Sequence, residues 1–258
     1  MRAQLALRLH DRRQDMRRSL SGGATAVEAA TRQWIEKFVI RERLCPFAAA
    51  SKIHVVVDYL ADEPAANWQI DPASDADRRL MLRGLQNAGM SITHLLSQHV
   101  PSAASSNLFL VWPAGLSDLG VFLPFVSAVT AHAGLASGAG GPEQANTPAT
   151  AFPFHPAMGH QAAGGPSLWH ALRQQTAPTE DFKFTSPFPM LHIIPAAELG
   201  RARKQLGSRA AAGGTHLLDR NLRLMQQAQS DDRQRWEKLL EECRQSVRDG
   251  EDITGEKG

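Results

Sequence analysis

The segment from Thr25 to Phe47 constrains the fold most, because it combines a helix start, a sustained apolar stripe and a stop. Thr25 and Glu28 have the spacing of a capping box. Because a proline disfavours helical geometry in the residue before it, Pro46 is expected to end the helix at Cys45. The apolar stripe follows the i, i+3, i+4, i+7 spacing of one helix face and consists of Val27, Ala30, Thr31, Trp34, Ile35, Phe38 and Val39.

The rest of the chain alternates between short apolar or β-branched runs and longer segments of helical periodicity. The runs predict strands at residues 53–59, 108–112, 151–156 and 190–194, and the periodic segments predict helices at 74–100, 117–133, 196–206 and from 215 onward. Two prolines in 151–156 place that strand at an edge or keep it short. A strand, a helix and a second strand in succession indicate a parallel crossover. The sequence therefore predicts one α/β domain with a small, mainly parallel sheet covered by helices.

Extensions are expected on both sides of this domain, which we place at residues 24–226. Residues 1–23 interleave arginines with leucines and end in Ser-Gly-Gly, a pattern typical of a mitochondrial presequence. A solvated basic extension of a cytoplasmic protein is the alternative reading. Residues 227–258 are expected to form a C-terminal helix followed by a polar tail that is unstructured from Asp249 on.

Composition and charge limit the classes of function. The 28 basic and 26 acidic residues give a net charge of +2, so no overall field favours a polyanion and nucleic-acid binding is unsupported. No apolar run reaches the roughly 20 residues that a membrane-spanning helix requires. The two cysteines, Cys45 and Cys243, are far apart in sequence and suggest thiols rather than a disulfide framework.

Four short motifs occur in a characteristic order: LCPFA at residues 44–48, FHP at 154–156, SPFPMLHII at 186–194 and RNL at 220–222. In this order and spacing they resemble the DUF1415 family, an uncharacterised and mainly bacterial family. The resemblance spans about residues 27 to 226. The family pattern continues from His-Pro with Asp-Tyr, where this chain has Ala157 and Met158, and it has Asn-Arg before Ser-Pro, where this chain has Phe184 and Thr185. The resemblance therefore implies a divergent member that has lost several polar groups.

The polar residues that remain suggest a site at the rim of the sheet. Cys45 could act as a nucleophile with His155 as its base and Ser186 nearby, although a helix C-terminus disfavours a thiolate. Arg220 and Asn221 are candidates for binding an anion, and His192 for lining the site. No pair of histidines or cysteines has the spacing of a zinc motif, so neither a metal nor a cofactor is predicted.

Two functions remain open at this stage. The loss of polar groups and the presence of extensions favour a non-enzymatic interaction or assembly subunit, in a mitochondrial complex if residues 1–23 are a targeting segment. Its partner would bind the apolar side of the C-terminal helix, through Trp236, Leu239 and Leu240, if that helix lies outside the domain. The alternative is a small-molecule enzyme with a cysteine–histidine site at the sheet rim.

Overall fold

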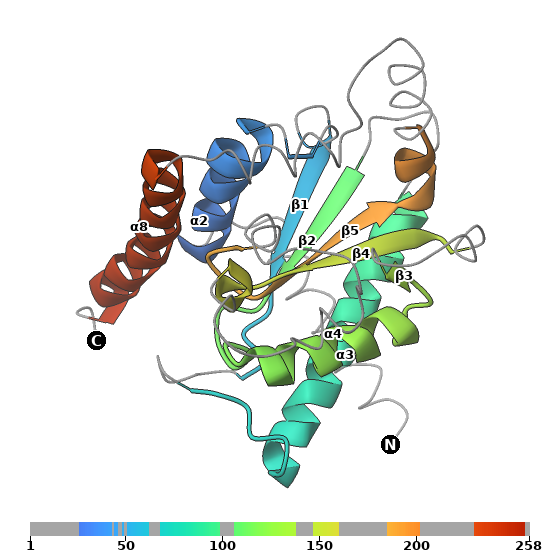
Figure 1. Ribbon diagram of the computed structural model, residues 1–258. Helices are drawn as coiled ribbons and strands as arrows, with labels where there is room; N and C mark the ends of the chain where they lie inside the picture. The colour runs from blue at the N-terminus through green and yellow to red at the C-terminus, as the bar shows by residue number, and fades with distance from the viewer. Residues whose placement is uncertain are drawn as a thin grey trace.

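The computed structural model describes residues 26–42, 44–45, 48, 51–61, 68–98, 106–137, 147–159, 185–201 and 230–255. These residues form a sheet with helices on both of its faces (Figure 1). The elements in chain order are α2 (Ala26–Trp34), η1 (Ile35–Ile40), β1 (Lys52–Val57), α3 (Asp75–Gln98), β2 (Ser106–Val111), α4 (Leu119–His132), β3 (Ala136–Ser137), β4 (Ala149–Phe154), η4 (Pro156–Gly159), β5 (Met190–Pro195), residues 196–201 as a helix, and α8 (Ser230–Gly255).

The first helix forms as predicted but ends earlier. Its second half, η1, is a π-helix, in which the backbone N–H of Arg41 donates to the carbonyl of Glu36 five residues before it. The apolar stripe is buried, with Trp34 and Phe38 almost completely enclosed. Because the helix ends at Ile40, Cys45 lies beyond it rather than at its last turn, which corrects the prediction. Thr25 and Pro46 lie outside the described residues.

The sheet is mixed rather than mainly parallel. Its strand order is β1-β2-β5-β4-β3. The β1/β2 and β3/β4 pairs are parallel, which confirms the crossover predicted for β1 and β2. β5 runs antiparallel to both of its neighbours, β2 and β4. All six residues of β5 are buried because it occupies the centre, so its apolar run is explained by burial and says nothing of its direction.

Two more differences concern the strands around β4. The short strand β3 was not predicted, because its two residues lie at the start of a Gly-rich segment. It pairs only with Thr150 and Ala151 of β4. Pro153 therefore lies past the end of β3, where its missing N–H removes no ladder bond on that side. The strand β4 is thus neither at the edge of the sheet nor short, which corrects the prediction from the two prolines, and it accommodates Pro153 because β3 covers only its first half.

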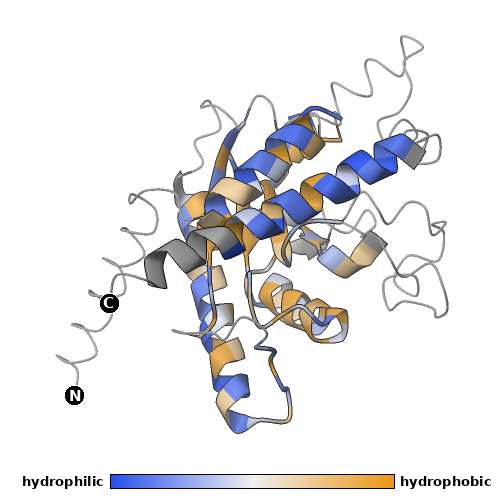
Figure 2. Cartoon of the chain, turned by 90° about the vertical axis from the view of Figure 1, so that its left-hand side faces the viewer, coloured by the Kyte–Doolittle hydropathy of each residue, from blue (hydrophilic) through white to orange (hydrophobic). Residues whose placement is uncertain are grey.

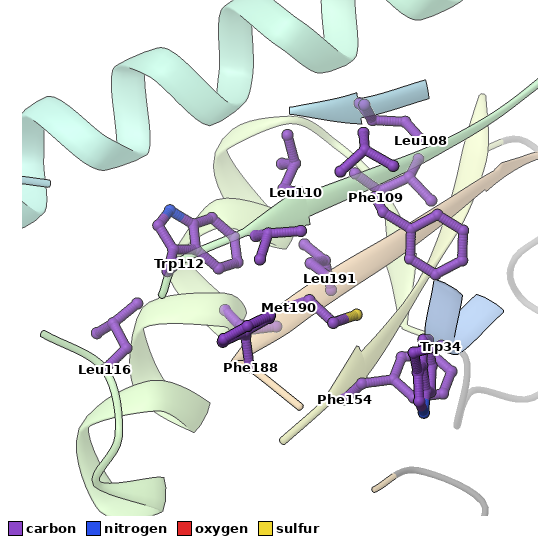
Figure 3. Packing of buried hydrophobic residues seen from close by; sticks show 14 of the residues in the cluster. Trp34, Leu108, Phe109, Leu110, Trp112, Leu116, Phe154, Phe188, Met190 and Leu191 are labelled. Atoms are coloured by element: carbon purple, nitrogen blue, oxygen red, sulfur yellow. The ribbon is translucent and has the colours of Figure 1, made fainter. Parts of the chain in front are cut away.

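The two faces of the sheet have separate aromatic cores. On one face, the Trp34 ring of α2 meets Phe154 of β4 edge-on, with ring centroids 5.6 Å apart (Figure 3). On the other face, Trp112 packs edge-on against Phe125 of α4, with centroids 5.2 Å apart. The alternation of side chains along β2 separates the two sets, since Phe109 points to the α2 side and Leu108 and Leu110 to the α4 side.

The C-terminal helix belongs to the compact fold, which corrects the expected position of its apolar side. Trp236 packs edge-on against Phe38, with ring centroids 5.5 Å apart, and its Nε1 donates to Glu42 Oε1 at 3.3 Å. Arg235 donates to the same carboxylate oxygen at 2.8 Å. Figure 2 shows α8 across the front of the molecule with mostly hydrophilic residues facing the viewer. The buried side of α8 consists of Trp236, Leu239, Leu240, Cys243 and Val247.

This packing leaves very little exposed surface at the residues predicted to hold a partner. Trp236 is 3% exposed, and Leu239 and Leu240 are similarly enclosed, so α2 of the same chain fills the role that we assigned to a second protein. The helix also continues through Gly255, where an unstructured tail was expected from Asp249. Residues 1–23 lie outside the described part of the chain, and no helix within the described part is long and apolar enough to cross a membrane.

Candidate functional site

One rim of the sheet brings together two of the three predicted catalytic residues. His155 follows the last residue of β4, and Ser186 precedes β5. Because β5 is antiparallel to β4, the start of β5 and the end of β4 lie at the same end of the sheet. The backbone N–H of Trp112, just after β2, donates to the Pro189 carbonyl at 2.9 Å and ties a third strand end to this rim.

His155 is held by the backbone at both ring nitrogens. Its Nδ1 accepts the N–H of Ala157 at 3.0 Å, so Nε2 carries the proton and donates to the Leu116 carbonyl at 3.0 Å. The side chain has no exposed surface. Burial lowers the pKa of His155 below its ordinary value, against the smaller raising effects of the Leu116 carbonyl and Asp118. The imidazole is therefore neutral near pH 7, and it joins the loop after β2 to the end of β4.

Ser186 is also engaged within the fold. Its hydroxyl donates to the Phe188 carbonyl two residues ahead, at 2.5 Å, and the side chain is completely buried. This hydrogen bond shapes the turn that leads into β5. A nucleophilic serine needs its proton directed toward a base, whereas this proton is directed toward a peptide carbonyl.

Cys45 is half-buried in the segment after η1, against the hydrophobic core, and forms no disulfide with Cys243. It follows the C-terminal end of η1 and is not at a helix N-terminus, so no helix dipole there favours a thiolate. Among the described residues, His155 cannot accept its proton without giving up the Ala157 N–H. In the predicted cysteine–histidine pair, His155 is therefore not oriented to act as the base.

His192 lies inside the sheet and not in an open site. Its ring stacks on Phe109 of the neighbouring strand, with centroids 4.1 Å apart and an angle of 6° between the planes. Phe152 and Phe154 stand 6.3 Å away on the other side. Burial lowers the pKa of His192 from 6.5 to about 3, so the ring is neutral. Its Nε2 has no hydrogen-bond partner among the described residues.

Two of the four positions that depart from the family pattern, Met158 and Thr185, lie in the interior. Met158 is 4% exposed, and Thr185 is completely buried with no hydrogen-bond partner for Oγ1 within the described chain. Ala157 contributes only its backbone N–H, to His155. The turn after His155 is thus apolar at Ala157 and Met158, where the family pattern has polar side chains. Phe184, Arg220 and Asn221 lie outside the described residues, so the predicted anion contact is not located.

Sequence reasoning missed Asn107. This residue of β2 is 1% exposed, and neither Oδ1 nor Nδ2 has a hydrogen-bond partner in the described part of the chain. It shares the α2-facing side of β2 with Phe109, two residues away. A lone amide directly before an apolar strand was a weak signal, since such a residue more often ends a loop. Within the described residues, no three histidine, cysteine, aspartate or glutamate side chains are grouped as metal ligands would be.

The comparisons with known proteins agree with the motif order. The family model described as "Protein of unknown function (DUF1415)" matches residues 26–235, which begin with α2 and extend into α8. No curated protein and no solved structure matches the chain. Since the match covers most of the sequence, this chain belongs to the DUF1415 family.

Proposed function

We propose that this protein is a non-enzymatic interaction or assembly subunit built on the DUF1415 fold. The observation that carries the proposal is that the polar side chains retained at the rim are used by the fold itself. Both nitrogens of His155 and the hydroxyl of Ser186 are bonded to backbone groups. A catalytic base must instead offer a lone pair to the substrate or the nucleophile.

The enzyme alternative requires these bonds to be broken. For His155 to act as a base toward Cys45, Nδ1 must release the Ala157 N–H in either tautomer: Nδ1 takes the thiol proton itself, or it carries the ring proton so that Nε2 has a free lone pair. Leaving a buried donor or acceptor unsatisfied costs about 1 to 3 kcal/mol. The hydrogen bonds of His155 therefore count against the cysteine–histidine enzyme and support the assembly role.

The native state of the endogenous protein tests this proposal directly. We expect the full chain, tagged at its own locus and isolated without overexpression, to migrate in a stable complex with other proteins on native gels and by sizing. Fractionation before purification also tests the predicted mitochondrial location, which rests on residues 1–23. Recovery of the chain with copies of itself alone would argue against an assembly role.

The pH dependence of thiol labelling separates the two functions at the level of Cys45. We expect iodoacetamide to label Cys45 slowly in the folded protein, with a rate that rises only above about pH 8.5, the ordinary thiol value. Cys243 provides an internal control, because burial raises its pKa to about 11 and its side chain has no exposed surface. Labelling of Cys243 would reveal unfolding and not reactivity.

A second measurement guards against an ambiguous result. His155→Gln keeps a donor for the Leu116 carbonyl but cannot act as a general base at neutral pH. We expect Cys45 labelling to be the same in this variant and in the wild type, as mapped by mass spectrometry. Rapid labelling of Cys45 near pH 6 that is lost in His155→Gln, with Cys243 still protected, would make the enzyme the leading interpretation.

A further inference from the structure

The strand β1 forms one edge of the sheet, and its hydrogen-bonding groups divide into two sets. The Asp58 N–H donates to the Val111 carbonyl of β2 at 2.9 Å. Backbone groups of successive strand residues point in alternate directions, so the N–H and C=O groups of Lys52, His54 and Val56 also point toward β2. The N–H and C=O groups of Ile53, Val55 and Val57 therefore point away from the sheet.

This edge carries few of the features that keep sheet edges from pairing. β1 contains no proline and no bulge, and its three outward residues are all β-branched. Among the described residues, only Arg32 of α2 donates to an outward group, through a 3.2 Å bond to the Ile53 carbonyl. Arg32 is also held by Glu28, with nitrogen and oxygen 2.8 Å apart. A carbonyl oxygen has two lone pairs, so this contact leaves capacity for a further donor.

We propose that β1 pairs antiparallel with β1 of a second copy of this chain, around a twofold axis at Val55. In this register Val55 lies opposite Val55, and Ile53 lies opposite Val57. Each residue with outward-pointing backbone groups therefore lies opposite another such residue. The two copies then share one continuous sheet with a self-complementary interface, as the common twofold dimers do.

Side chains on both faces of β1 fit this register. On the α2 side, Ile53 and Val57 are only partly buried, and pairing would place each of them beside the other across the axis. Cross-strand pairs of β-branched residues stabilise antiparallel sheets. On the α3 side, Lys52 would lie opposite Asp58, which gives two pairs of opposite charge per dimer. Lys52 is exposed, and Asp58 is half-buried near Asn87 of α3.

Neighbouring registers lose these matches. A shift by one residue would set outward groups of one copy against inward groups of the other, which breaks the ladder. A shift by two residues would put Lys52 opposite Val56 or Leu60 and would leave one β-branched residue without an equivalent partner. The register centred on Val55 is the one that retains all three outward residues and both charge pairs.

This dimer goes beyond the proposed function, because the two copies would pair whether or not other proteins bind to them. The two are tested separately: the endogenous complex concerns foreign partners, while the dimer concerns the purified full chain alone. We expect light scattering after size exclusion to give twice the mass of one chain at micromolar concentration.

Val57→Pro tests whether β1 forms the interface. The substitution removes an outward N–H that the β1/β2 ladder does not use, so the fold should tolerate it as edge strands tolerate proline. We expect a monomer whose circular dichroism matches that of the wild type. A dimer that persists in this folded variant, or a wild-type chain that is monomeric, would overturn the proposal.

Disulfide formation tests the register even if Val57→Pro proves too unstable to purify. In a Cys45→Ser background, Val55→Cys should form a covalent dimer on mild oxidation, because hydrogen-bonded antiparallel pairs have Cα atoms about 5.5 Å apart, within disulfide range. The matched control is Val56→Cys. Its two copies would lie about 8 Å apart from strand geometry, too far to be bridged. Cross-linking through position 56 and not 55 would contradict the register.

Discussion

Replacing Trp34 by alanine should lower the free energy of unfolding by about 3 to 5 kcal/mol, which is a large share of the stability of an ordinary domain. Trp34 has no exposed surface, and its ring contacts Phe38 of η1. It also contacts Phe154 of β4 (Figure 3). It therefore joins the first helix to a strand that follows more than a hundred residues later in the sequence. Truncation would leave a large cavity between α2 and β4, and neither element can collapse into it without losing its other contacts.

Chemical denaturation of the variant and of a matched control measures this effect. Leu82 of α3 is 60% exposed, so Leu82→Ala removes apolar atoms without opening a cavity and should change stability by no more than about 0.5 kcal/mol. We expect Trp34→Ala to unfold at much lower denaturant concentration or to be recovered in the insoluble fraction. A soluble variant with the midpoint of the wild type would mean that α2 is not part of the core.

The individual helices and strands could be predicted from the sequence, because the spacing of apolar residues reflects which side chains are buried. The apolar runs of β1 and β2 and the stripe in α2 each indicate which side chains are removed from water. The prediction of a single α-helix up to Cys45 failed at a finer level, since π-type bonds such as Arg41 to Glu36 bury the same residues as α-type bonds do. Apolar pattern does not distinguish the two kinds of turn over six residues.

Long-range pairing was the part that sequence did not determine. β5 reads as a buried strand in either direction, because a strand enclosed on both faces has the same composition whether its neighbours are parallel or antiparallel. The apolar side of α8 was predicted correctly, but its partner was not. Trp236 could have met another protein or α2, and only the position of Phe38 and Glu42 in space decides for α2.

The candidate site shows the same division. Sequence order identified His155 and Ser186 as polar residues at the ends of strands, and the structure places both at one rim. Whether a side chain has a lone pair to offer depends on backbone groups that come from elsewhere in the chain. The Leu116 carbonyl, which accepts from His155, lies 39 residues earlier and has no sequence signature. Roles for these residues could therefore not be assigned before the fold was known.

The buried His192 should make the fold sensitive to acid. Burial lowers its pKa from 6.5 to about 3 in the folded protein, while the unfolded chain keeps the ordinary value. Between these two pH values the unfolded state binds more protons than the folded state. The stability contributed by the neutral, buried His192 is therefore complete above about pH 6.5 and is lost as the pH falls toward 3. One such group changes the free energy of unfolding by up to about 1.4 kcal/mol per pH unit.

His192→Phe isolates this contribution. Phenylalanine can keep the stacking on Phe109 and cannot be protonated, so the variant should lose less stability than the wild type on acidification. We compare the free energy of unfolding of the two proteins at about pH 7.5 and about pH 4.5. On acidification, the difference should shift by about 2 to 3 kcal/mol in favour of His192→Phe. Carboxylates and His155 titrate in both proteins and cancel in this comparison. The exposed His132, replaced by phenylalanine, serves as the control for adding an aromatic ring. Parallel stability curves for His192→Phe and the wild type would show that His192 gains a proton within the fold, and hence that its Nε2 has a partner or contact with water.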